Sequence, residues 1–248
     1  MREQTEFGSK LIDKNTSSLK KYQKIVVGSE NLLYLFVYEI YHMFLSPLGG
    51  ALGFVLRKFC CKFLFKKVGA SPTIGRNISL RHANNIVLGD NVIIDDNAVL
   101  DAKGEGNEGI VIGNNVLIGR NSILSCKGTG KGGNIKIGNN TNIAMFCTLH
   151  SETEIVIGNN VLFAAYTYII SGGRHDYARK DIPIIEQPSV FKGIIEIEDD
   201  IWIGAKTMIM GSLKISRGSI VGACSLVNKS LPEYSISFGV PAVVKKSR

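Results

Sequence analysis

The sequence has few of the residues that interrupt or cross-link a chain. Of its 248 residues, 6 are proline and 1 is tryptophan, and its 5 cysteines include no CxxC pair. Paired zinc ligands and a disulfide framework are therefore not indicated. We expect reduced, buried thiols, which fit a cytosolic protein. The cysteines are Cys60, Cys61, Cys126, Cys147 and Cys224.

Acidic residues are scarce at the start of the chain. Residues 1–67 hold 11 Lys or Arg against 5 Asp or Glu, whereas residues 68–248 hold 18 against 16. The net charge of +8 therefore belongs mainly to the first segment. No recognised nucleic-acid module accompanies it, so we expect no nucleic-acid partner. Basic residues mixed with aromatic and aliphatic ones favour an anionic membrane surface instead.

What the sequence does contain is a period of six residues. Aliphatic or aromatic residues recur at this spacing, glycine often follows them, and Asn-Asn or Asp-Asn often comes next, as in IGNN. Such residues suit turns in the left-handed region. The period predicts a parallel β-helix, in which three six-residue edges make one triangular coil of 18 residues with an aliphatic residue per edge on the axis. The predicted inward positions are Ile74, Leu80, Leu88, Ile94, Leu100, Ile112, Ile118, Leu124, Ile137, Ile143, Leu149, Ile157, Phe163, Ile169, Ile197, Ile203, Ile209, Ile215, Val221 and Val227.

Departures from this period locate insertions. The repeat triplets begin at 88, 112, 137, 157, 197 and 215, so the steps are 24, 25, 20, 40 and 18 residues. Two inserts, AKGEGNEG (102–109) and CKGTGKGG (126–133), are polar and glycine-rich and are predicted to be exposed tips. The longest, about 171–193, contains SGGRHDYARKDIP. Because so long a loop in a compact domain is usually functional or disordered, we expect it to carry the site.

Residues 1–67 lie outside the repeat, and we expect them to form an N-terminal helical extension to a solenoid domain over 68–248. Apolar runs at 32–45 and 51–67 are shorter than the ~18 residues that suggest a membrane span, and no cleavable signal peptide is indicated. The second run predicts an amphipathic basic helix. Two roles stay open: capping the solenoid alone, or capping it and contacting a membrane surface through residues 31–67. The predicted apolar stripe is Leu52, Val55, Leu56, Phe59, Phe63 and Leu64, and the predicted charges around it are Arg57, Lys58, Lys62, Lys66 and Lys67.

The C-terminal part resembles a known family. Its IGNNV repeats, its HDY loop ending in IP, and the runs IEIEDDIWIGAKTMI and GSIVGACSLVNKSLPEYSISFGVPAVVKK resemble hexapeptide-repeat acetyltransferases. The branch is that of galactoside, maltose, nodulation-factor and polysaccharide O-acetyltransferases. The resemblance covers roughly residues 70–248 and is most specific over 155–245. It implies a left-handed β-helix, a homotrimer and acetyl-CoA as donor, with no metal; the left hand comes from the resemblance alone, because crossover rules favour a right hand.

The resemblance also implies a catalytic base. Acetyl transfer from a thioester to a sugar hydroxyl needs a group that takes the hydroxyl proton and donors for the developing oxyanion. A histidine with a pKa near ~6.5 suits the first task. His175, in the long insert, matches the family's catalytic histidine. His150 is the rival, because a related branch of amino-sugar N-acetyltransferases uses a histidine at a similar corner.

Acceptor residues are predicted around these histidines. Asp176 and Tyr177 follow His175, and Asp176 either binds the sugar or fixes the loop. Galactoside-type enzymes carry an asparagine where this sequence has Ala144. We expect Asn142 or the backbone to supply that contact, with His150 as a further acceptor residue.

The donor side matches the family more fully. The resemblance implies a groove for the pantetheine chain of acetyl-CoA, built from small residues that expose backbone groups. Terminal lysines are placed to meet the CoA phosphates. The predicted donor-binding residues are Trp202, Gly204, Ala205, Gly222, Ala223, Asn228, Lys229, Lys245 and Lys246.

These inferences favour an acetyl-CoA-dependent O-acetyltransferase that modifies a sugar of a surface polysaccharide or lipid-linked glycan. The expected location is cytoplasmic or peripheral on the inner face of the cell membrane. Two alternatives stay open: an amino-sugar N-acetyltransferase that depends on His150, and a scaffold without acetyl-CoA affinity. A zinc carbonic anhydrase would need three clustered histidines, which His150 and His175 alone do not supply.

Overall fold

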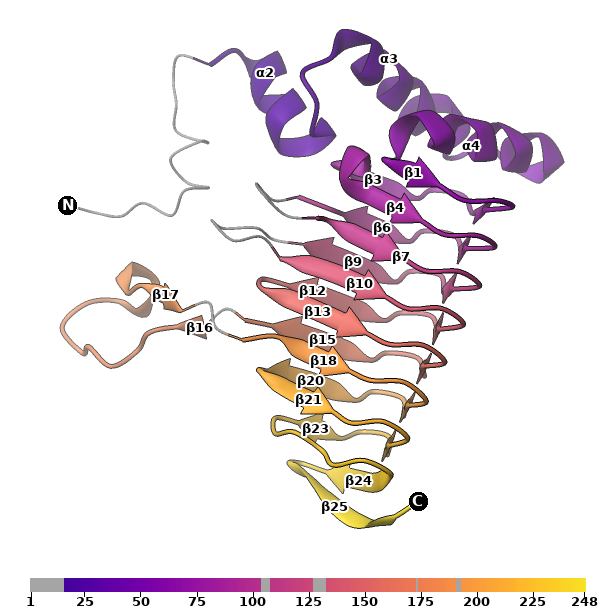
Figure 1. The fold of residues 1–248 in the computed structure, drawn as a ribbon. Coiled ribbons are helices and arrows are strands. Elements are labelled where there is room, and N and C mark those ends of the chain that lie inside the picture. Colours follow the sequence, from indigo (N-terminus) through magenta and orange to yellow (C-terminus); the bar gives the residue numbers. More distant parts are fainter. Residues whose placement is uncertain (1–15, 104–107, 127–132, 173, 191–192) are drawn as a thin grey trace.

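The computed structural model is a left-handed parallel β-helix with helices at one end (Figure 1). It describes residues 16–103, 108–126, 133–172, 174–190 and 193–248, and for residues 174, 175, 189 and 190 it describes the backbone. Each coil passes through sheets A, B and C in turn, which makes three long walls and three corners. The predicted fold class is confirmed.

Strands of the same wall stack from coil to coil in parallel, except the last pair of sheet B. Sheet A contains β1 (Lys67–Val68), β4 (Ile86–Leu88), β7 (Ile110–Ile112), β10 (Asn134–Ile137), β13 (Glu154–Ile157), β18 (Ile195–Ile197) and β21 (Leu213–Ile215). Sheet B contains β2 (Thr73–Ile74), β5 (Ile93–Ile94), β8 (Leu117–Ile118), β11 (Asn142–Ile143), β14 (Leu162–Phe163), β19 (Trp202–Ile203), β22 (Ile220–Val221), β24 (Ser235–Gly239) and β25 (Ala242–Ser247). Sheet C contains β3 (Ser79–Arg81), β6 (Val99–Asp101), β9 (Ile123–Cys126), β12 (Thr148–Ser151), β15 (Tyr168–Ser171), β20 (Met208–Gly211) and β23 (Leu226–Val227).

The predicted register is confirmed in all three walls. Every predicted inward residue is at most 3% exposed, so each coil buries its aliphatic residues against the coils above and below. Equivalent residues pair directly. The sheet A column is Leu88, Ile112, Ile137, Ile157, Ile197 and Ile215.

The asparagines of the IGNN motif form ladders at the corner between sheets A and B. Asn91, Asn115, Asn140 and Asn160 have φ of 54–57°, as predicted for turns in the left-handed region. Their side-chain amides donate from one coil to the next at 3.0–3.2 Å. The preceding residue of each motif accepts a backbone N–H of the coil before it, as Asn139 does from Asn114 at 2.7 Å. The ladders satisfy polar groups that the turns leave unpaired.

All three predicted insertions leave the solenoid at one corner, between sheets C and A. They follow β6, β9 and β15 and precede β7, β10 and β18. The tips at 104–107 and 127–132 lie outside the described residues. The long insertion carries β16 (Arg174–His175) and β17 (Ser189–Val190), an antiparallel pair that projects away from the coil (Figure 1).

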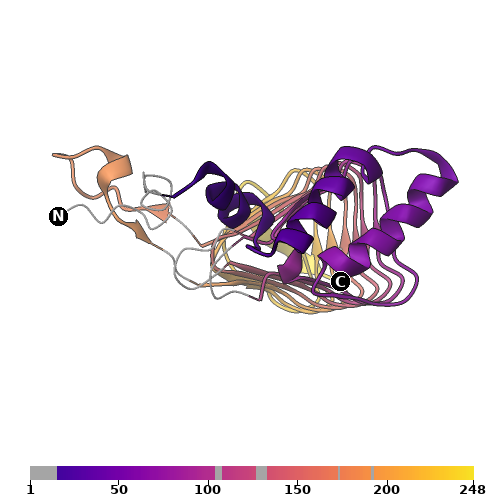
Figure 2. The same ribbon diagram turned by 90° about the horizontal axis from the view of Figure 1, so that it is seen from above.

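The helices cover the first coil. They are α2 (Ser18–Tyr22), a π-helical turn (Gln23–Val27), α3 (Leu32–Ile40) with its π-helical continuation (Tyr41–Leu45), and α4 (Gly50–Leu64). Asn31 caps α3 by accepting the Leu33 and Tyr34 N–H groups at 2.8 and 3.0 Å. Seen from above, α3 and α4 lie across the end of the coil (Figure 2). Among the described helices, none is both long and apolar enough to cross a membrane.

The face of α4 that packs on the coil differs from the predicted stripe. Gly53, Cys60, Cys61 and Leu64 are buried, whereas most of the predicted stripe points to solvent, with Phe63 73% exposed. Arg57, predicted as a surface charge, is 3% exposed. This face packs on the coil because the small side chains of Gly53, Cys60 and Cys61 let the helix approach the coil closely. The apolar residues at the remaining positions stay outside.

Candidate active site

The hairpin β16–β17 carries the predicted catalytic sequence. His175 pairs with Ser189, and the Asp176 N–H donates to the Pro188 carbonyl at 2.9 Å. The His175 side chain lies outside the described part of the structure. Its backbone is held on a two-stranded arm, so the residue is presented away from the coil wall (Figure 1).

A buried amide organises the rest of the insertion. Gln187 is 3% exposed, donates through Nε2 to the Arg179 carbonyl at 2.8 Å, and accepts the Arg179 N–H at 3.2 Å. Arg179 also forms an ion pair with Asp181, which raises the pKa of Arg179 and lowers the pKa of Asp181. Sequence reasoning missed Gln187, whose one signal is a glutamine between the hydrophobic pair at 184–185 and Pro188.

The two predicted acceptor residues after His175 differ in their contacts. Asp176 accepts the Ala178 N–H at 3.1 Å, which forms a local turn and supports the loop-fixing role. Tyr177 is 68% exposed. Of the two side chains, only that of Tyr177 is thus largely open to a ligand.

His150 lies on the outer face of sheet C, in register with Ser125 and Ile170. Its Nε2 is 3.5 Å from a carboxylate oxygen of Glu152, and the imidazole is 24% accessible. An imidazole beside a carboxylate is chemically competent as a base. Its place near the C–A corner puts it on the same side of the solenoid as the His175 hairpin.

Asn142 and Trp202 share one column on the outer face of sheet B. Asn142 pairs with Leu162, which pairs with Trp202 in the next coil. Trp202 is 51% exposed. The structure therefore places a predicted acceptor residue and a predicted donor residue on the same wall, two coils apart, although they are far apart in the sequence.

The small predicted donor residues stack at the corner between sheets B and C. Gly204 and Ala205 follow β19, and Gly222 and Ala223 follow β22, directly beneath them. A Cβ at Gly204 would lie 2.4 Å from the Ala223 nitrogen, so this glycine is required for coil stacking. Coil packing alone therefore explains why a glycine occupies this position, with or without a bound ligand.

The remaining predicted donor residues divide between two places. Lys245 lies on β25 with its Nζ 5.5 Å from the ring centroid of Phe238, and Phe238 lies against Gly222. Lys246 pairs with Ile236 on the same strand pair. Asn228 and Lys229 follow β23 and are exposed near the C–A corner.

Two groups of predicted site residues therefore lie at opposite ends of sheet C. The donor residues around Ala205 and Ala223 lie at the B–C corner, whereas the insertion with His175 leaves at the C–A corner. Within one chain the strands of sheet C separate the two corners.

The outer walls differ in chemistry, which sequence reasoning missed. Sheet A carries ion pairs, as between Lys136 and Glu154 at 3.2 Å. Sheets B and C and their shared corner instead expose large apolar side chains, all at least 37% exposed. These are Ile93, Leu162 and Trp202 on sheet B, Ile123, Tyr168, Met208 and Met210 on sheet C, and Met145, Phe146 and Tyr166 at the corner. The sequence signal for these walls was the large apolar residues that stand between the predicted inward positions of sheets B and C.

The cysteines are free thiols, and one prediction about them is wrong. Cys60, Cys61, Cys126 and Cys147 are buried, and burial raises the pKa of each thiol. Cys224 is exposed, because it occupies a left-handed corner position with φ of 56° that points outward.

Comparisons with known proteins agree with the fold. No protein-family model matches the chain. AntD, an N-acyltransferase from Bacillus cereus solved with dTDP and coenzyme A, superposes with a TM-score of 0.51 at 23% identity, covering 82% of this chain and 91% of that one. At this identity the likeness establishes the fold.

Curated relatives match a part of the sequence. A probable acetyltransferase of Mycobacterium tuberculosis is 32% identical over 47% of this chain and 38% of its own length. The chloramphenicol acetyltransferase of Morganella morganii is 32% identical over 43% of this chain and 50% of its own length. The galactoside O-acetyltransferase of Escherichia coli is 31% identical over 46% of this chain and 54% of its own length. The chain thus spans about half or less of each relative, and these matches confirm its resemblance to the hexapeptide-repeat acetyltransferases.

Proposed function

We propose that the protein is an acetyl-CoA-dependent O-acetyltransferase that modifies a hydroxyl of a sugar. The observation that carries the proposal is the hairpin β16–β17, which raises a His-Asp sequence away from an otherwise regular solenoid. The similarity to acetyltransferases, including a galactoside O-acetyltransferase, supports the reaction class. AntD is described in complex with coenzyme A and with 3-hydroxybutyryl-CoA, which supports an acyl-CoA donor.

In the proposed reaction the His175 imidazole takes the proton of a sugar hydroxyl as its oxygen attacks the thioester carbonyl. The carbonyl π electrons move to oxygen, and the tetrahedral intermediate then collapses and expels the CoA thiolate. The imidazolium returns its proton to that thiolate, so products are the acetyl ester and CoA. Asn142 or a backbone N–H on the same wall donates to the developing oxyanion. Asp176 holds the hairpin turn.

The donor is proposed to lie along the B–C corner. The small residues at 204–205 and 222–223 leave room for a thin pantetheine chain beside Trp202, which offers an apolar wall. Lys245 and Lys246 supply positive charge for the CoA phosphates. From the C–A corner of a neighbouring copy, Lys229 adds a further positive charge and Asn228 a neutral amide donor. No metal is proposed in this step.

A homotrimer completes this site. The exposed apolar side chains of sheets B and C form the kind of surface that association covers, while sheet A carries ion pairs suited to solvent. Cyclic assembly would place the His175 hairpin of one copy beside the B–C corner of the next. We further propose a cytoplasmic location, which the free buried thiols support, and an acceptor in a surface polysaccharide or lipid-linked glycan.

A second candidate is N-acylation of an amino sugar. AntD, of the same fold, is described with dTDP-4-amino-4,6-dideoxyglucose in one of its complexes and is an N-acyltransferase. The His150–Glu152 pair favours this candidate, because it places an imidazole beside a carboxylate. An acceptor with a free amine and a dependence on His150 distinguish it.

The test is calorimetry of acetyl-CoA with the wild type and with His175→Ala, followed by a transfer assay. We expect both proteins to bind acetyl-CoA with similar Kd, and transfer to fall by about 10²–10⁴-fold in the variant, the usual contribution of a general base. Transfer that persists in His175→Ala would exclude this base. If the wild type binds no acetyl-CoA, the acetyltransferase proposal fails and a scaffold role becomes the better account.

A further inference from the structure

The helical extension exposes many large apolar side chains to solvent. Nine large apolar side chains on α3, its continuation and α4 are each 44–73% exposed. We call this set the apolar face. It consists of Leu32, Leu33, Phe36, Met43, Phe44, Leu52, Val55, Phe59 and Phe63.

Attachment to the solenoid does not account for this face. The helices bind the coil through their other side, where Tyr38, Tyr41, Cys61 and Leu64 are at most 3% exposed and the Tyr38 hydroxyl donates to the Leu80 carbonyl at 2.6 Å. A helix that only caps a core needs one apolar stripe, with polar residues opposite. These two helices have apolar residues on both sides, so a second partner is required.

The charge of the segment identifies that partner. From residue 40 to residue 89 the sequence contains no Asp or Glu, but it contains seven basic residues. Lys62, Lys66 and Lys67 are exposed at the end of α4. The Lys62 ammonium lies 5.9 Å from the ring centroid of Phe59, so apolar and basic groups share one surface. These side chains suit the boundary between acyl chains and headgroups, where lysine keeps its charge in water.

We propose that the apolar face rests on a lipid bilayer that contains anionic headgroups. A second copy of the chain is a poorer partner, because it would bring together two surfaces rich in basic residues, and the acidic residues near the apolar face, Glu30 and Glu39, already contact Lys24 and Tyr22 of the same chain. A bilayer supplies both the apolar layer and the negative charge. Because α4 is held against the coil by its opposite side, its axis lies along the membrane surface, as in interfacial helices.

The geometry also relates this surface to the proposed site. The helices cover the N-terminal end of the solenoid, and the β16–β17 hairpin projects sideways several coils below (Figure 1). In a cyclic trimer, symmetry places the three apolar faces on the same side of the ring. Three weak contacts then act together, and the sites stand at a fixed height above the membrane, facing membrane-linked glycans.

Co-flotation of the full chain with vesicles tests the proposal. We expect the protein to float with vesicles of phosphatidylcholine and phosphatidylserine, more weakly with phosphatidylcholine alone, and less as salt is added. In Phe59→Ser/Phe63→Ser we expect at least about tenfold weaker partitioning to both kinds of vesicle, because two aromatic side chains no longer enter the lipid. In Lys62→Glu/Lys66→Glu we expect partitioning to weaken by about tenfold or more, and only for the vesicles that contain phosphatidylserine.

The matched control is Val243→Ser/Val244→Ser. These valines are 47% and 48% exposed and lie on β25 at the other end of the solenoid, so flotation should equal that of the wild type. Circular dichroism melting checks that every variant folds. Wild-type protein that floats with neither kind of vesicle overturns the proposal. The proposal is also overturned if the wild type forms an assembly larger than a trimer and the Phe59/Phe63 variant makes that assembly smaller, because the apolar face would then bind a second copy. Acetyl-CoA binding is measured in parallel, so failure of the membrane proposal is distinguishable from failure of the proposed function.

Discussion

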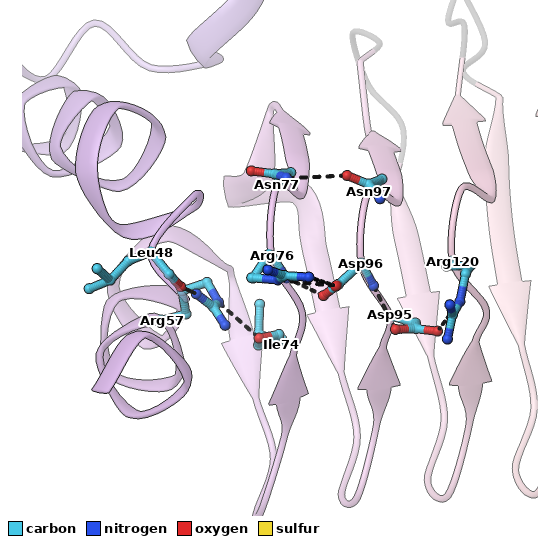
Figure 3. A network of polar contacts seen from close by, with 9 residues as sticks. All are labelled: Leu48, Arg57, Ile74, Arg76, Asn77, Asp95, Asp96, Asn97 and Arg120. Atoms are coloured by element: carbon cyan, nitrogen blue, oxygen red, sulfur yellow. Dashed lines mark hydrogen bonds and ion pairs between the residues drawn. The ribbon is translucent and has the colours of Figure 1, made fainter. Parts of the chain in front are cut away.

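Arg57 on α4 donates from Nε to the carbonyl of Ile74 on the first coil at 3.0 Å (Figure 3). The same guanidinium donates to the carbonyls of Leu45 and Leu48 in the turn between the helices. One buried side chain thus connects two helices to the solenoid. It donates to three carbonyl groups at the end of the β-helix and in the helix hairpin, of which Leu45 also accepts the Leu48 N–H at 3.3 Å.

Replacement of Arg57 by methionine should therefore destabilise the helical extension. The apolar stem is kept but three carbonyls lose the guanidinium donor, so we expect a loss of about 2–4 kcal/mol in the free energy of unfolding, measured by urea denaturation. Lys58→Met, at the neighbouring half-buried position, should change stability by less than about 0.5 kcal/mol. Unchanged or higher stability in Arg57→Met would show that removing the buried charge offsets the lost hydrogen bonds.

The Arg76–Asp96 pair links the first two coils and should make stability depend on pH. Asp96 accepts the Arg76 N–H at 2.7 Å and forms an ion pair with its guanidinium at 2.9 Å, and these contacts lower the pKa of Asp96 (Figure 3). Because the folded pKa is lower than the unfolded one, the stabilisation is full above ~3.9 and is lost as the pH falls through the folded value.

Asp96→Asn should thus cost about 0.5–1 kcal/mol at pH 7, a small amount because the pair is half-exposed. The cost should shrink as the pH falls towards 2, because Asp96 becomes protonated. Thermal unfolding across this range measures the difference, with Glu233→Gln, an exposed carboxylate elsewhere, as the control. A deficit that is the same at both pH values would contradict the assignment to the ion pair.

Gln187 is expected to act as a positioning residue for the proposed base. Gln187→Met removes the hydrogen bonds that tie Arg179 and Ile182 together across the insertion. We expect kcat to fall by about tenfold or more, because a base misplaced by ~1 Å loses much of its effect. The Kd of acetyl-CoA and the melting temperature should hardly change, since the insertion lies off the core. A parallel loss of acetyl-CoA affinity would instead indicate a general structural defect.

His150→Gln distinguishes the two candidate reactions. If His175 is the base, transfer to a hydroxyl should change by less than about threefold, whereas a base at position 150 would cost about 10²–10⁴-fold. The measurement is acetyl transfer to sugar acceptors with a free hydroxyl and with a free amine. Loss confined to the amine acceptor would move the proposal to N-acylation.

Gly204→Ala should destabilise the solenoid itself, independently of any bound ligand. The added Cβ would meet the backbone of the next coil, and we expect a cost of about 1–3 kcal/mol. Gly49→Ala, where a Cβ meets nothing within 4 Å, is the matched control in urea unfolding. Equal stability of the two variants would show that the coils can separate at this corner. Because Gly204→Ala changes the packing itself, donor binding is better tested by a substitution at Trp202.

Much of the fold was predictable because the repeat is a local signal. Inward residues such as Leu88 and Ile112 stack because each coil repeats the same six-residue edge, and the insertions stand out as excess length. The face of α4 was not predictable in the same way. Several arrangements satisfy its helical periodicity, and the coil that packs against it accepts Gly53 and Arg57 where the sequence pattern favoured Phe59 and Phe63.

The sequence by itself determined the β-helix, its register and the position of the long insertion, because hydrophobic period and loop length are properties of neighbouring residues. The tertiary structure decided which corner each predicted site residue occupies. It separated the His175 hairpin from Ala205 and Ala223, and it buried Arg57 while leaving the apolar face outside. Those outcomes depend on contacts between segments far apart in the chain, which no local pattern encodes.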